Sequence, residues 1–166
     1  ECPVLLLPLQ VQGLPRFERV VVGARFDDDI APVLAYVTAL LRAMGVRAFT
    51  IVQEVGFVNR LTARYASDEE REEFENDQRR ILLDYLSVFD LSGFTVDVDV
   101  LEESAEGVAS VDYARSVGAD LLVFQAPSRS LTIWDRLFTH PAESVLSSLP
   151  CSMLLFRAEQ LREAKE

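Results

Sequence analysis

The apolar residues of this chain change repeatedly between two spacings, and this alternation restricts the fold more than any other feature. Short apolar runs at residues 20–22 and 121–124 predict buried strands. Between such runs, apolar residues recur three and four positions apart, as on one helix face; the first set is Ile30, Val33, Leu34, Val37, Leu41 and Met44. This order predicts an α/β domain with a parallel sheet, helices on both faces and right-handed crossovers.

Five strands and the helices between them are predicted from residue 20 onward. The further strands are expected at residues 48–52, 96–100 and 153–156, and the helices at residues 30–44, 66–89, 103–117 and 140–149. Asp29 is placed to cap the first helix and Gly45 to end it. The core-facing residues expected in the second half of the long helix are Phe74, Ile81, Leu82, Tyr85 and Phe89. Ligands in such sheets bind beyond the carboxyl ends of the strands, at the switch point.

Composition excludes several classes of function. The formal net charge is −11, so phosphate backbones are repelled and no nucleic acid partner is expected. No apolar run reaches the ~20 residues of a membrane span, and residues 1–8 do not form a secretory signal. The two cysteines, Cys2 and Cys151, favour buried thiols in a reducing, cytoplasmic compartment. The single lysine, Lys165, lies in the terminal tail and does not suit a phosphate loop.

Two segments resemble motifs of a known family: Gly118-Ala119-Asp120-Leu121-Leu122-Val123 and residues 142–154. The first is similar to the start of the fourth strand of the universal stress protein family, and the second is similar to its final helix and strand. The resemblance covers residues 18–157. It implies an open sheet of five parallel strands in the order 3-2-1-4-5, of the adenine nucleotide alpha hydrolase type. The alternating strand at residues 96–100 would then lie at one edge, and residues 153–156 at the other.

The start of the chain resembles the final strand. Residues 2–8 are similar to residues 151–157, which predicts an extra N-terminal edge strand that is the remnant of an upstream domain. The predicted organisation is therefore an arm at residues 1–17, the domain at 18–157 and a tail at 158–166. Antiparallel pairing of the two segments, within one chain or between two, would make a dimer edge from Val4, Leu5, Leu6, Met153, Leu154 and Leu155. The alternative is an unrelated apolar arm that packs on the core.

The nucleotide site implied by the resemblance has lost its usual residues. ATP-binding members of the family carry a loop of the form G-x2-G-x9-G-[S/T] after the fourth strand, whose glycines let backbone N–H groups approach the phosphates. Gln125 and Ser128 stand where the first two glycines would, and Pro127 removes one N–H. Thr139-His140 matches the final pair at a spacing one residue longer.

The adenine side of the site departs from the family pattern as well. The family's first strand usually ends in a turn whose Asp contacts adenine, and Arg25 occupies that position after Ala24. The alternative to a lost site is residual binding of ATP, AMP or another anion near a helix N-terminus. The cofactor-binding candidates by family match are Ala24, Arg25, Gln125, Ser128, Arg129, Thr139 and His140.

Other candidate sites have simpler interpretations. His140 is the single histidine and lacks partners for a metal site, so a helix N-cap is the preferred role. The acidic run at residues 27–29 suits a helix cap better than a cation site. The acidic stretch at residues 68–77 is either a solvated helix face or a docking surface for a basic partner. The apolar residues between 131 and 138 either plug the vacant pocket or contact a partner.

These observations predict a non-catalytic, universal-stress-like regulatory or dimerisation domain with a degenerate nucleotide site and neither cofactor nor metal. Its partner would be a second copy or a tandem domain, joined through the final strand. Such domains also occur in the cytosolic tails of membrane transporters, which allows a membrane-tethered location. The rival functions are a sensor that still binds a nucleotide or another anion, and a weak phosphohydrolase. No general base, metal cluster or phosphate loop in the sequence supports the phosphohydrolase.

Overall fold

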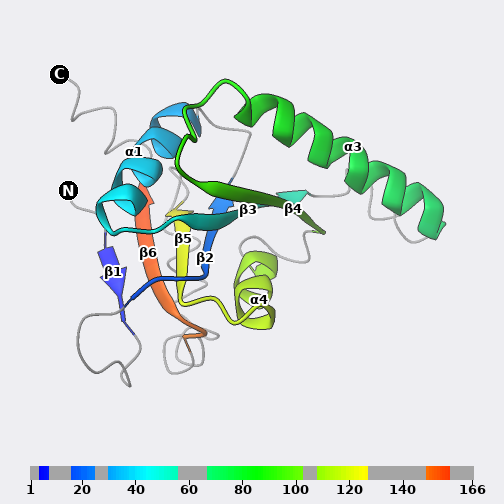
Figure 1. The fold of residues 1–166 in the computed structure, drawn as a ribbon. Helices are drawn as coiled ribbons and strands as arrows, with labels where there is room; N and C mark the ends of the chain where they lie inside the picture. Colours follow the sequence, from blue (N-terminus) through cyan, green and yellow to red (C-terminus); the bar gives the residue numbers. More distant parts are fainter. Residues whose placement is uncertain are drawn as a thin grey trace.

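A computed structural model describes residues 4–7, 16–24, 30–55, 67–102, 108–126 and 149–157. Strands and helices alternate along this part of the chain, as the apolar pattern predicts (Figure 1). The elements are β1 (Val4–Leu6), β2 (Val20–Ala24), α1 (Ile30–Ala43), β3 (Ala48–Val55), α3 (Asp68–Leu86), β4 (Thr95–Glu102), α4 (Val108–Ser116), β5 (Leu121–Ala126) and β6 (Ser152–Arg157). The helix predicted at residues 140–149 falls almost entirely outside the described residues, as does the tail at 158–166.

The strands form one six-stranded sheet in the order β1-β6-β5-β2-β3-β4. Strands β2 to β6 are parallel to their neighbours. Counted from residue 20, their order is 3-2-1-4-5, so the predicted sheet is confirmed. The extra N-terminal edge strand is confirmed too, because β1 pairs antiparallel with β6 in the same chain, with Val4 opposite Leu155 and Leu6 opposite Met153.

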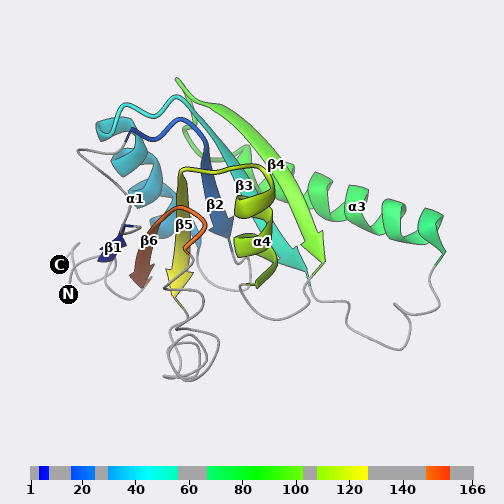
Figure 2. The same cartoon turned by 90° about the horizontal axis from the view of Figure 1, so that it is seen from below.

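The two faces of the sheet carry separate apolar clusters because side chains alternate along each strand. Helices α1 and α3 lie on one face and α4 lies on the other (Figures 1 and 2). The first cluster joins Val22 and Ile51 of the sheet to Leu41 and Leu82 of the two helices. The members of the second cluster include Val21, Val52, Leu122, Met153, Leu155 and Ala114 of α4. Both faces of the central strands β2 and β5 are therefore buried.

Helix α1 ends at Ala43, and Gly45 follows as the predicted terminating residue. That glycine adopts a φ of 76°, the left-handed region in which a residue without a Cβ is favoured. The Gly45 N–H donates to the Arg42 carbonyl, and the Val46 N–H donates to the Leu41 carbonyl. The chain then turns back into β3.

Helix α3 begins with a capping box that the sequence analysis did not identify. The Glu70 N–H donates to the Ser67 hydroxyl, and the Glu70 carboxylate accepts the Ser67 N–H at 2.7 Å. The backbone and hydroxyl hydrogen bonds from Ser67 lower the pKa of Glu70. The expected core face was partly wrong: Ile81 is 56% exposed, whereas Leu82 and Leu86 are buried. The acidic half of α3 extends away from the sheet (Figure 1) and is mostly exposed.

Strand β4 lies at the free edge of the sheet, as its alternating pattern predicts. Two of its three carboxylates pair with arginines of α3: Arg79 Nη2 lies 2.7 Å from Asp99, and Arg71 Nη1 lies 3.5 Å from Glu102. Charged side chains along an edge strand disfavour pairing with another chain. The polar face of β4 therefore protects this edge.

Two further properties concern single groups. Cys151 is buried, and burial raises the pKa of its thiol to about 11, so the thiol is neutral at neutral pH. Cys2 lies outside the described residues.

Within the described part of the chain, no helix combines the length and apolar character needed to cross a bilayer.

The carboxylate of Asp120 joins the beginnings of β2 and β5. It accepts the Glu18 N–H at 2.7 Å and the Arg19 N–H at 3.0 Å. In return, the Asp120 N–H donates to the Arg19 carbonyl at 2.9 Å. The pairing of β2 with β5 thus begins at Asp120, whose carboxylate is a charged hydrogen-bond acceptor.

We expect Asp120→Ala to lower the free energy of unfolding by about 1–2 kcal/mol, because charge-assisted hydrogen bonds to two backbone N–H groups are lost at a partly exposed site. Asp120→Asn keeps one acceptor oxygen and should lose less. Urea denaturation measures the difference. Asp112→Ala, which removes an exposed ion pair with Arg115, is the control and should change stability by about 0.5 kcal/mol or less. Equal losses in Asp120→Ala and the control would contradict this role.

Candidate functional site

The strand connections reverse direction between β2 and β5. From β2 the chain passes through α1 to β3 on one side, and from β4 it returns through α4 to β5 on the other. The carboxyl ends of β2 and β5 therefore form the switch point at which ligands bind in sheets of this kind. Gly23 pairs with Phe124 there, and Ala24 and Gln125 follow this pair directly.

The structure places two of the seven predicted cofactor-binding residues at this point. Ala24 ends β2, and Gln125 lies within the last two residues of β5, where the sequence predicts the start of a loop. The remaining five lie outside the described residues; they are Arg25, Ser128, Arg129, Thr139 and His140. The apolar segment at 131–138 and the acidic run at 27–29 also lie outside them. Their roles in binding stay predictions.

An aromatic ring fills the space beside Gly23 on the α4 face of the sheet. A Cβ added at Gly23 would lie 3.0 Å from Cδ2 of Phe124 and 3.5 Å from Oγ of Ser110. Phe124 is partly buried against the apolar cluster beneath α4. The absence of a Cβ at Gly23 therefore makes room for a side chain of the chain itself.

The N-terminus of α4 is occupied by a carboxylate. The Ser110 N–H, in the first turn of the helix, donates to Glu54 Oε1 at 2.7 Å. Glu54 lies near the carboxyl end of β3. A helix N-terminus has unpaired N–H groups and a partial positive charge, so it attracts anions. Here the anion is the Glu54 carboxylate of the protein itself.

Sequence analysis did not identify Phe124 or Glu54 as site residues. Phe124 reads as one more apolar strand residue, and Glu54 as a polar residue at a strand end. Their partners are distant in the chain, since Glu54 is 56 positions from Ser110. The one available signal is Gly23 at the end of a β-branched run, because an interior strand glycine indicates close approach of another group.

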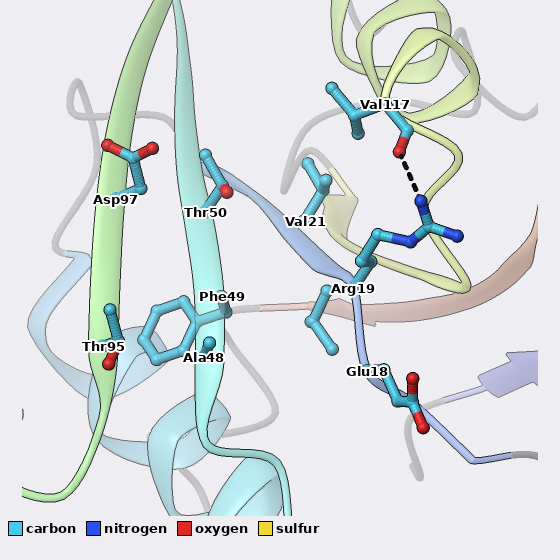
Figure 3. Close-up of a pocket in the computed structure, with 10 residues that line it drawn as sticks. Glu18, Arg19, Val21, Ala48, Phe49, Thr50, Thr95, Asp97 and Val117 are labelled. Carbon is cyan, nitrogen blue, oxygen red and sulfur yellow. Dashed lines mark hydrogen bonds between the residues drawn. The ribbon is translucent and has the colours of Figure 1, made fainter.

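The structure shows a pocket at the opposite end of the sheet. Its volume is about 230 Å³, and it lies where β2, β3 and β4 begin (Figure 3). Sequence reasoning missed this pocket because it considered the carboxyl ends alone. Among the described residues, no group of three or more His, Cys, Asp and Glu side chains is arranged to hold a metal ion.

No family profile matches this sequence, and no curated protein matches it. Solved structures do match. A universal stress protein from Archaeoglobus fulgidus aligns with a TM-score of 0.59 and 15% identity, over 93% of this chain and 49% of that chain. A protein from the universal stress protein family of Burkholderia pseudomallei aligns with a TM-score of 0.52 and 18% identity, over 87% of this chain and 98% of that chain.

This chain has the fold of the universal stress proteins. The fold agrees with the expectation drawn from the sequence resemblance. This chain spans about half of the length of the Archaeoglobus protein and nearly all of the Burkholderia protein. At these identities the match concerns the universal-stress fold, and function has to be argued from the residues of this chain.

We expect Gly23→Ala to destabilise the protein by about 1–3 kcal/mol, because the new methyl group overpacks the contact with Phe124. The cost should shrink in a Phe124→Leu background, since the two residues share this contact. Chemical denaturation of the four proteins in this double-mutant cycle measures the coupling. Additive losses would show that Phe124 does not occupy the space beside Gly23.

Proposed function

We propose that this chain is a non-catalytic regulatory domain of the universal-stress type whose nucleotide site is degenerate. The observation that carries the proposal is the filled switch point: the Phe124 ring lies against Gly23, and Glu54 occupies the N-terminus of α4. A phosphate brought to this helix end would meet a carboxylate instead of free N–H groups. A base brought to the α4 side of Gly23 would meet the Phe124 ring.

The sequence supports the same proposal from the other side of the switch point. Gln125 and Ser128 replace glycines of the family's phosphate loop, and Arg25 replaces its adenine contact. The substitutions in the loops and the filled space on the sheet face therefore both support a degenerate nucleotide site. The alternative function is a sensor for ATP, AMP or another anion, held by the loop arginines. It is favoured by the basic and hydroxyl side chains that remain at residues 128–130.

Nucleotide titration separates the two functions. We expect ATP, AMP and cyclic dinucleotides at millimolar concentration to leave the melting temperature unchanged and to give no binding heat in calorimetry. A ligand at 100 times its dissociation constant would stabilise the fold by about 2.7 kcal/mol, which thermal denaturation detects easily. Saturable binding that Arg129→Ala abolishes would overturn the degenerate site and establish the sensor.

The proposed partner is a second copy of this chain, or a tandem domain, that pairs with β6. The middle of β6 is buried and apolar: Met153, Leu154 and Leu155 are 4%, 7% and 6% exposed. Its outer edge is taken by β1, which has three residues. Leu6 packs on the core, whereas Leu5 is 44% exposed. Because β1 contributes so little apolar contact, we propose that a longer strand can replace it.

Removal of β1 tests this arrangement. A variant lacking residues 1–7 should expose the outer edge of β6. At the same protein concentration, a larger fraction of this variant than of the full chain should be dimeric. Light scattering after size exclusion measures the mass, and circular dichroism checks that the variant is folded. A synthetic peptide of residues 1–8 should return the variant to its monomeric mass. A folded variant that stays monomeric would contradict the proposed role of the β6 edge.

A further inference from the structure

The 230 Å³ pocket lies on the sheet face that carries helix α4. Ser110, in the described part of α4, lies beside Gly23 near the carboxyl end of β2. Val117, just after the end of the helix, lines the pocket at the opposite end of the sheet. The beginnings of β2, β3 and β4 form the pocket floor (Figure 3).

Two rows of side chains form this floor. Val21 pairs with Thr50, and Thr50 pairs with Asp97, so these three residues stand side by side across β2, β3 and β4. Ala48 pairs with Thr95 in the row below. Figure 3 shows the Arg19 guanidinium and the Asp97 carboxylate on opposite sides, with Val21 and Thr50 between them. The carboxylate of Glu18 points away from both (Figure 3).

The next acidic residue of β4 shows what an internally satisfied carboxylate looks like on this face. Asp99 forms an ion pair with Arg79 at 2.7 Å and lies near the Tyr113 hydroxyl of α4. Burial raises the pKa of Tyr113, and the negative charges of Asp99 and Asp97 add to this shift. Asp97 accepts the N–H of its neighbour Val98 at 2.8 Å and forms no ion pair with any described residue. It lines the pocket.

The backbone on the positive side of the pocket is held by hydrogen bonds. The Arg19 N–H donates to the Asp120 carboxylate, and the Arg19 carbonyl accepts the Asp120 N–H. Its guanidinium lies beside Gly118 and donates to the Val117 carbonyl at 3.5 Å. A guanidinium has five N–H donors, so this one long bond leaves most of them available. Arg19 also forms no ion pair among the described residues.

We propose that this pocket binds a small zwitterion of amino-acid size, with its carboxylate at Arg19 and its ammonium group at Asp97. Opposite charges on opposite sides fit a ligand that carries both charges, and Val21 and Thr50 suit a short chain between them. A simple anion would be repelled by Asp97, and a simple cation by Arg19. The volume lies below the roughly 300–1,000 Å³ of pockets for drug-sized ligands, which restricts the ligand to a few heavy atoms.

A series of ω-amino acids, from glycine to 6-aminohexanoate, tests the proposal with the intact chain. The separation between the two charges grows along the series, so affinity should peak at one chain length. Amide chemical shifts in ¹⁵N-labelled protein give the affinity and the location, with changes expected at Thr50, Thr95 and Val117. Butyrate and butylamine carry one charge each and should bind at least about tenfold more weakly than the best member.

Matched variants locate the binding. Arg19→Gln and Asp97→Asn should each weaken the best ligand by about tenfold or more, because each removes one charged partner. Arg115→Gln and Asp112→Asn alter an exposed ion pair of α4 outside the pocket and should leave the affinity unchanged. The proposal is overturned if no member of the series shifts the pocket amides. Affinities that do not depend on chain length, or that both pocket variants retain, would overturn it as well.

Discussion

The pairing of β2 with β5 is the interaction on which the rest of the structure depends. It begins at the Asp120 carboxylate, which accepts hydrogen bonds from the N–H groups of Glu18 and Arg19. In a parallel pair, fixing one end fixes the register along both strands. The same register that starts at Arg19 therefore brings Gly23 opposite Phe124 at the far end. One charged acceptor at the amino end thus determines which side chains meet at the switch point.

Helix α4 lies between the two ends of the β2–β5 pair. A charged side chain of the appropriate sign lies at each terminus of the helix. Glu54 accepts an N–H at its N-terminus, and Arg19 donates to Val117 just beyond its C-terminus. Both contacts complement the helix dipole, which is positive at the N-terminus and negative at the C-terminus. Since neither partner belongs to the helix, the two contacts also set where α4 sits along the sheet. Its first turn lies beside Gly23 at the carboxyl end, and Val117 lines the pocket at the amino end.

Most of the fold could be predicted from the sequence, because it follows from local periodicity and general rules of topology. The β-branched run of β2, the alternating pattern of β4 and Gly45 after α1 each report a local constraint. Ile81 was misplaced because the apolar stripe of α3 is narrow: Leu82 and Leu86 alone are fully buried, and neighbouring apolar residues face water. The capping box of α3 was readable in principle, since Ser67 and Glu70 stand at the characteristic spacing.

The candidate sites could be predicted less well because they depend on residues that are distant in the chain. Family resemblance located Ala24 and Gln125 at the switch point, but no local pattern shows that Phe124 lies against Gly23 or that Glu54 reaches Ser110. The same limit applies to Asp97 and Asp99, which look equivalent in an alternating strand. Their difference arises from a partner elsewhere in the chain: Arg79 of α3 pairs with Asp99, whereas Asp97 forms no ion pair with a described residue and lines the pocket. Contacts between distant segments therefore separate a carboxylate that is satisfied internally from one that faces a pocket.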